Sequence, residues 1–437
     1  MKGLVPALFH RMHEAVLGPM EPGMDPRRVK SHSHFILEAS VGQITYTLTT
    51  GVFMTGFALY LGASDNLTGI IASIPMLMNV LQVAAALLME RVKHKKRVIN
   101  LLNLAYRSIM SLAIFIPLLL PERWWVPAFV AMNVLGFLFC SVLSPSFNDW
   151  MMGLTLPRVR GRFFARREAS FQAAGMAASL IMGVVVDVFH KTYAAFLIPY
   201  LVAFACGILD YVFISGIEEP AETKRPDSPK RSMKERLMRN VQLFEFAGIW
   251  VLWYFGYWMA FAYFSVFMVS TLGLSYSFMT VQNTVQVLSL VLTIGLWGRY
   301  ASRRGWPKCL LFTCVMVILG FFTRGFVTRE LYLLLLPIGV ITGVGFAGMN
   351  IAATNMVALL CDPEDRSLCF GMHAALGGLA GFLGSLAGGA LNEGLAAVSI
   401  GPFSGIHLTF FIAGIVMAGS MAVFALWSRR IAPREIE

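Results

Sequence analysis

Charged residues are scarce in this sequence of 437 amino acids: 14% are Asp, Glu, Lys or Arg, whereas 57% are hydrophobic. Soluble globular domains usually carry about 25% charged residues. A chain with so little charge does not cover a water-facing surface of its own size, and its mean hydropathy of +0.68 points the same way. The composition therefore excludes an ordinary soluble protein.

Sequence signatures of enzymes are also missing. The chain has no G-x-x-x-x-G-K-[ST] motif for ATP phosphates, no H-E-x-x-H zinc motif and no G-x-S-x-G nucleophile motif. The pairs His10/His13 and His32/His34 lack further spaced ligands. We therefore expect no enzymatic activity, no cofactor and no metal site.

Cysteine is rare, and its placement argues against disulfides. The chain contains no C-x-x-C pair, and no cysteine falls in a loop that we predict to be extracytoplasmic. The six cysteines lie inside predicted spans or on the basic side of the chain: Cys140, Cys206, Cys309, Cys314, Cys361 and Cys369.

Long apolar runs fill most of the sequence. A helix needs about 20 apolar residues to cross the hydrocarbon of a bilayer, and the short alternating segments of a β-barrel are not present. We therefore predict an all-α polytopic membrane protein with twelve spans, at residues 36–61, 66–90, 98–120, 124–146, 168–190, 193–216, 244–270, 276–298, 308–327, 331–359, 372–397 and 405–427.

The basic residues are distributed unevenly between the loops. The net charge of +11 does not form one basic patch interleaved with aromatics, so we expect no nucleic-acid partner. Most of the 35 lysines and arginines lie in the even-numbered loops and the termini, and only Arg123, Lys191 and Arg329 lie on the other side. The positive-inside rule then places both termini in the cytoplasm of an inner or plasma membrane.

A polar, proline-containing stretch from Glu218 to Asn240 divides the spans into six and six. We expect the following organisation: a cytoplasmic N-terminal segment at 1–34, a six-helix bundle at 35–217, a cytoplasmic linker at 218–242, a second six-helix bundle at 243–430 and a cytoplasmic tail at 431–437.

The two halves repeat one another at a fixed offset. Residues after span 4 recur 206 positions later after span 10, and further pairs continue through spans 5 and 11. One match is noise, but a run at one offset, in register with the topology, indicates a duplication. The pairs are Pro157/Pro363, Arg160/Arg366, Phe164/Phe370, Gly175/Gly381, Ser179/Ser385, Gly183/Gly389 and Asp187/Glu393.

Two kinds of cytoplasmic loop resemble those of the major facilitator superfamily of transporters. The loop from Gly298 to Lys308 is similar to the G-x-x-x-[DR]-[RK]-x-G-[RK] motif, and the loops starting at Pro157 and Pro363 are similar to the motif that follows span 4. The loop after span 2 has Met89-Glu90 in place of the usual Gly–Asp pair. The span 5 motif of antiporters is absent, so antiport is not supported.

The resemblance implies a secondary transporter in which two bundles alternately expose a site to each side of the membrane. It also implies that transport can be coupled to H⁺ or Na⁺. Loop arginines and nearby carboxylates at the cytoplasmic ends of the spans are candidates for a gate, although the arginines alone would also set topology. The candidate gate residues are Glu38, Asp149, Arg160, Glu245, Arg299 and Arg366.

Two arginines fall within predicted spans. Arg107 lies near the middle of span 3, where an arginine costs about 2.5–3.5 kcal/mol on insertion scales. It should therefore face the bundle interior, and Asp210 in span 6 is its nearest partner by depth. Arg324 lies nearer the outer end of span 9, where we expect it to snorkel to the interface.

Spans 1 and 7 are predicted to line a substrate cavity. Span 1 is rich in threonine and other polar residues, and span 7 carries an aromatic stripe at helical spacing. The alternatives are an aromatic belt with ordinary packing, and hydrogen bonding between helices for the two asparagines. The candidate cavity residues are Gln43, Tyr46, Thr50, Arg107, Asn133, Trp250, Tyr254, Trp258 and Asn350.

We therefore expect a monomeric permease with a small-molecule substrate and the lipid bilayer as its partners. The aromatic span 7 favours export of apolar or aromatic compounds, and the polar span 1 favours uptake of a sugar-like solute. A scramblase or receptor built on the same fold is the alternative that does not transport a solute.

Overall fold

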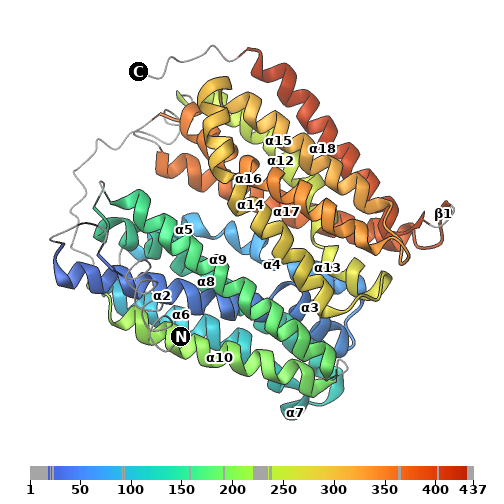
Figure 1. Cartoon of the computed structure of the whole chain (residues 1–437), viewed down its shortest axis with the longest axis horizontal. Coiled ribbons are helices and arrows are strands. Elements are labelled where there is room, and N and C mark those ends of the chain that lie inside the picture. The colour runs from blue at the N-terminus through green and yellow to red at the C-terminus, as the bar shows by residue number, and fades with distance from the viewer. Residues whose placement is uncertain are drawn as a thin grey trace, which may run out of the picture. The chain divides into compact units, whose positions relative to one another are not determined.

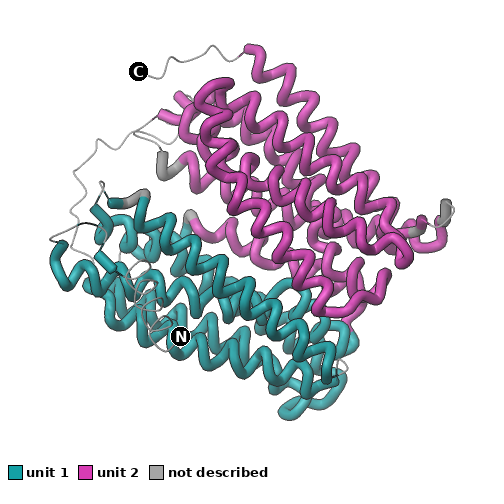
Figure 2. The backbone as a smooth tube through the Cα atoms, viewed as in Figure 1, with its two compact units in different colours: residues 1–62, 84–228 teal, residues 63–83, 229–437 magenta. Residues whose placement is uncertain are grey.

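The computed structural model is helical throughout, apart from one short hairpin (Figure 1). It describes residues 18–19, 21, 24–90, 92, 94–156, 159–189, 192–219, 235, 239–362, 366–400 and 403–430. Most of the predicted linker at 218–242 lies outside these residues. The chain divides into two compact units, residues 1–62 with 84–228 and residues 63–83 with 229–437 (Figure 2).

The first unit packs α2 against α9 and α10, and packs α6 against α8 and α10. Its elements are α2 (Pro26–Thr49), α3 (Gly51–Tyr60), most of α5 (Gln82–Glu90), α6 (Lys95–Leu112), η1 (Ala113–Phe115), α7 (Ile116–Leu119), η2 (Glu122–Trp124), α8 (Trp125–Leu154), α9 (Arg160–Val188) and α10 (Tyr193–Ser215).

The second unit packs α12 against α17 and α18, and α16 against α14 and α15. It includes α4, which packs against α17. Its elements are α4 (Asp65–Asn79), α12 (Val241–Phe261), α13 (Phe264–Val266), η3 (Phe267–Thr271), α14 (Tyr276–Arg304), α15 (Trp306–Gly325), η4 (Tyr332–Leu334), α16 (Leu335–Leu360), α17 (Arg366–Gly394), β1 (Ser399–Ile400), β2 (Phe403–Ser404) and α18 (Ile406–Ser428).

The predicted fold class is confirmed as a helical membrane architecture. Within the described part of the chain, ten helices are long and apolar enough to cross a membrane. The first two predicted spans are each divided into two helices, α2 with α3 and α4 with α5. This division is why neither of them counts as one continuous spanning helix.

An aromatic core fixes the end of α2 on which a charged site is built. Phe35 makes edge-on ring contacts with Phe147 and Trp150 of α8 and with Phe163 of α9, at centroid distances of 5.7, 5.8 and 6.2 Å. These rings are almost fully buried. Because Glu38 follows Phe35 by one turn, the core also fixes the position of its carboxylate.

The break between α2 and α3 lies in the middle of the first predicted span. Thr50 is extended, with φ −131° and ψ −174°, and Gly51 has φ +55°. The Thr50 hydroxyl donates to the carbonyl oxygen of Tyr46 at 2.6 Å. This bond satisfies a carbonyl at the interrupted end of α2, as backbone within a membrane requires.

Replacing Gly51 with alanine is expected to destabilise the protein by about 1–2 kcal/mol, because an L-residue at positive φ is strained. No neighbour lies within 4 Å of a Cβ built at this position, so the effect would come from backbone conformation alone. Gly248→Ala in α12 is the matched control, since that site is equally open but helical. Thermal unfolding in detergent measures both variants, and equal stability of the two would contradict the assignment of strain.

Candidate functional site

A buried ion pair joins α6 to α10 in the first unit. The Nε of Arg107 lies 2.9 Å from Oδ2 of Asp210, whose side chain is fully buried. The Arg107 Nη1 donates to the carbonyl oxygen of Gly42 on α2 at 2.9 Å, and Asn103 donates to the same Asp210 oxygen at 3.0 Å. The pairing of Arg107 with Asp210, expected from their depths, is confirmed.

Two glycines make room for this guanidinium. A Cβ on Gly42 would lie 2.5 Å from the Arg107 Nη2, and a Cβ on Gly207 would lie 2.8 Å from the Arg107 Cβ. Contacts that short do not occur in folded proteins, so a larger residue at either position would displace Arg107. The sequence analysis did not single out these glycines, because nothing in the chain places them beside residue 107.

A second buried pair lies one turn along α2. Arg167 of α9 approaches Glu38 at 3.3 Å, with side-chain exposures of 18% and 7%. Glu38 was predicted as a gate residue, whereas Arg167 was not selected among the several arginines after span 4. The signal that could have found it is the helical register of α9, which turns residue 167 toward α2.

Several polar atoms of this cluster have no partner. Oδ1 of Asp210, Oε1 of Gln43 and Nε of Arg167 are buried without a hydrogen bond among the described residues. Gln43 follows Gly42 and faces Gly175 of α9, where a Cβ would lie 2.8 Å from the Gln43 Cγ. The free oxygen of Asp210 can therefore accept a proton or a hydrogen bond from a ligand. The amide oxygen of Gln43 can accept a hydrogen bond from a ligand.

The other cavity candidates of the first unit lie in two different settings. Tyr46 lies one turn before the end of α2 and is 40% exposed, and Thr50 is the residue at the break. Asn133 of α8 is buried and donates to the carbonyl oxygen of Phe129 in its own helix at 2.9 Å. Asn133 thus makes a bond within its own helix, whereas Tyr46 is exposed and Thr50 is half-buried.

The aromatic stripe of α12 packs within the second unit. Trp250 stacks near Trp253 and Phe246, at centroid distances of 5.7 and 5.6 Å. Gly377 and Gly381 of α17 lie against Tyr254 and Trp258, respectively. The indole nitrogens of Trp250 and Trp258 have no hydrogen-bond partner in the described part of the chain. Asn350 of α16 is exposed.

The gate candidates are only partly visible in the structure. Oε2 of Glu245 accepts from the Trp427 indole nitrogen of α18 at 2.8 Å, and Arg299 is exposed near the end of α14. The side chains of Asp149, Arg160 and Arg366 lie outside the described residues, so their gating role stays a prediction.

The expectation that Arg324 snorkels is wrong. Its side chain is buried, with 3% exposure, and its guanidinium carbon lies 4.3 Å from the centre of the Phe264 ring. The Nη1 atom has no partner among the residues described. Packing of α15 against α16 and α18 encloses this end of the helix, which spacing along one helix does not predict.

No group of three or more His, Cys, Asp or Glu side chains that could hold a metal occurs within the described ranges. The polar cluster around α2 consists of two ion pairs, a buried amide oxygen of Gln43 without a partner among the described residues, and a broken helix. Such an arrangement can bind a polar solute or a proton, because buried charges in a membrane protein face the interior and mark its pathways.

Comparison with known proteins gives a family and a fold. The sequence model of the Major Facilitator Superfamily matches residues 39–328. No curated protein matches the sequence.

Solved structures share the fold at low identity. A nucleoside transporter, NupG, superimposes with a TM-score of 0.71 at 13% identity, covering 91% of this chain and 99% of that one. A bacterial homologue of the human lysosomal transporter Spinster gives 0.69 at 13%, covering 94% and 100%. A D-xylose–proton symporter gives 0.69 at 12%, covering 90% and 96%.

Proposed function

Since this chain belongs to the major facilitator superfamily, we propose that it is a secondary active transporter that moves a small solute across the membrane by alternating access. The observation that carries the proposal is the buried charge cluster of the first unit, in which Arg107, Asp210, Glu38 and Arg167 lie on four different spanning segments. Charges within a membrane are expensive, and function is the usual reason for their presence.

The substrate class that the site supports best is a polar, sugar-like or nucleoside-like solute. The amide oxygen of Gln43 has no partner among the described residues, and Tyr46 and Thr50 lie where the first span is interrupted. Discontinuous helices with free backbone groups are typical of substrate sites in transporters. Two proteins of similar structure, a nucleoside transporter and a D-xylose–proton symporter, support the same class. Export of an apolar or aromatic compound is the alternative, based on α12.

Coupling to protons fits the cluster better than coupling to sodium. Two buried carboxylates each face a guanidinium, so gain of a proton by one of them would release its arginine without any further ligand. Sodium would require several oxygen ligands in a shell around it, and guanidinium groups would repel the ion. The protein would act as a monomer in the cytoplasmic membrane with both termini inside.

The test uses proteoliposomes that contain a pH-sensitive dye and a panel of nucleosides, pentoses and aromatic compounds. Solute-dependent proton movement is expected for at least one polar solute. Glu38→Gln, which mimics a permanently protonated side chain, is expected to reduce proton-driven accumulation by about tenfold or more, since it removes a charge-assisted bond to Arg167. Counterflow exchange of the same solute should remain.

The control is Glu122→Gln in η2, because this carboxylate is exposed and lies outside both the candidate gate and the buried charge cluster. This control should couple normally. If no solute in the panel crosses the membrane, the transporter proposal fails. A scramblase or receptor function is then the better hypothesis. If Glu38→Gln accumulates solute as well as the wild type, Glu38 does not couple.

A further inference from the structure

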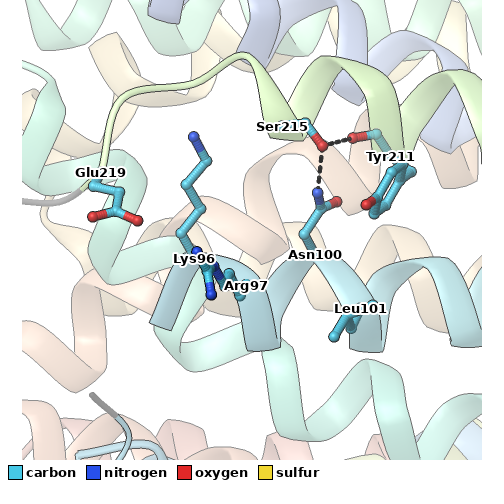
Figure 3. Close-up of a pocket in the computed structure, with 7 residues that line it drawn as sticks. All are labelled: Lys96, Arg97, Asn100, Leu101, Tyr211, Ser215 and Glu219. Atoms are coloured by element: carbon cyan, nitrogen blue, oxygen red, sulfur yellow. Dashed lines mark hydrogen bonds between the residues drawn. The ribbon is translucent and has the colours of Figure 1, made fainter. Parts of the chain in front are cut away.

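A polar pocket lies away from the charged cluster, where the basic end of α6 meets the end of α10. It is an open depression with a volume of about 380 Å³, lined by Lys96, Arg97, Asn100, Leu101, Tyr211, Ser215 and Glu219 (Figure 3). This volume lies in the range of sites for small molecules, which is about 300–1,000 Å³. We propose that this pocket binds the headgroup of an anionic phospholipid that carries hydroxyl groups, such as phosphatidylglycerol.

The charges of the pocket select an anion. Lys96 and Arg97 face one acidic residue, Glu219, so the lining carries a net charge of one positive unit. Lys96 donates to the carbonyl oxygen of Ile217 after α10, which holds its ammonium group at the pocket wall. A phosphodiester with one negative charge balances this lining, whereas a zwitterionic headgroup does not.

A buried acceptor in the pocket requires a donor from the ligand. Asn100 is 6% exposed, and its amide nitrogen donates to the Ser215 hydroxyl at 2.6 Å. Ser215 in turn donates to the carbonyl oxygen of Tyr211 at 2.8 Å, which fixes the direction of the chain of bonds (Figure 3). The amide oxygen of Asn100 is left without a partner among the described residues. A hydroxyl on the headgroup would satisfy it.

The helix surfaces that continue from the pocket suit acyl chains. Leu101 and Leu112 lie along the outward side of α6 and are 59% and 37% exposed. Leu201 and Ile208 follow the same side of α10 as Ser215 and are 42% and 44% exposed. A basic pocket at the positive side of a spanning segment, followed by exposed apolar side chains, is the chemistry that an anionic lipid requires.

The binding is tested on the full-length protein in detergent by native mass spectrometry and thermal shift, with phosphatidylglycerol, phosphatidylcholine and soluble glycerol 3-phosphate as probes. Phosphatidylglycerol is expected to be retained and to raise the melting temperature, and the other two probes are not. Arg97→Gln should weaken its binding by about tenfold, since a charge-assisted bond is lost. Arg304→Gln, an exposed basic residue at the end of α14, should bind like the wild type.

A second variant separates the hydroxyl contact from the charge. Asn100→Leu should weaken phosphatidylglycerol but leave phosphatidylmethanol unchanged, because the latter has the same phosphodiester without a hydroxyl. Equal binding of phosphatidylcholine and phosphatidylglycerol would overturn the proposal. So would an equal shift with glycerol 3-phosphate, which would make the pocket a site for a soluble anion, or unchanged binding by both pocket variants.

Discussion

Replacing Asp210 with alanine is expected to destabilise the protein by about 3–5 kcal/mol, the usual effect of leaving one member of a buried ion pair without its partner. Arg107 would keep its bond to the Gly42 carbonyl but would lose both the 2.9 Å contact and the negative charge that compensates it. Asn103 would lose its acceptor as well. Thermal or chemical unfolding in detergent measures the change.

A double substitution tests the cause of this loss. Arg107→Met removes the stranded charge and keeps an unbranched apolar stem, so Asp210→Ala combined with Arg107→Met should be more stable than Asp210→Ala alone. Glu245→Ala is the control carboxylate, because it is exposed and accepts a single bond from Trp427. Equal loss in the single and the double variants would show that Asp210 acts through packing and not through charge.

Replacing Gly388 with alanine is expected to cost about 1–3 kcal/mol or more, the range for overpacking a close contact. A Cβ at this position would lie 2.0 Å from the carbonyl oxygen of Met259, and one at Gly384 would lie 2.2 Å from that of Phe255. Because these neighbours are backbone atoms, α12 and α17 would have to move apart. The small residues of α17 therefore let it approach α12 closely.

Gly419→Ala is the matched control for this prediction. It lies within α18, where no atom approaches a built Cβ within 4 Å, so alanine should be neutral or slightly stabilising. Both variants are compared by thermal unfolding and, once a substrate is known, by transport rate. A Gly388→Ala protein as stable as the Gly419→Ala protein would show that the close approach of α12 and α17 does not determine stability.

Local properties of the sequence determined the membrane class and the family. Each depends on composition, on apolar run length or on spacing along the chain, and none requires a side chain to be placed in space. The partner of Arg107 was also predictable, because depth in a bilayer is a one-dimensional coordinate that the sequence supplies. Few carboxylates lie at a similar depth to such an arginine, so its partner can be inferred.

Only the tertiary structure decided which helix faces meet. It paired Glu38 with Arg167, enclosed Arg324 and packed the stripe of α12 against glycines of α17. It also placed the interruption of the first span at Gly51. The physical reason is that rotation of each helix about its axis is set by contacts between residues far apart in sequence, and a membrane span is apolar on most of its sides. Hydropathy thus locates such helices along the chain but leaves their orientation to packing.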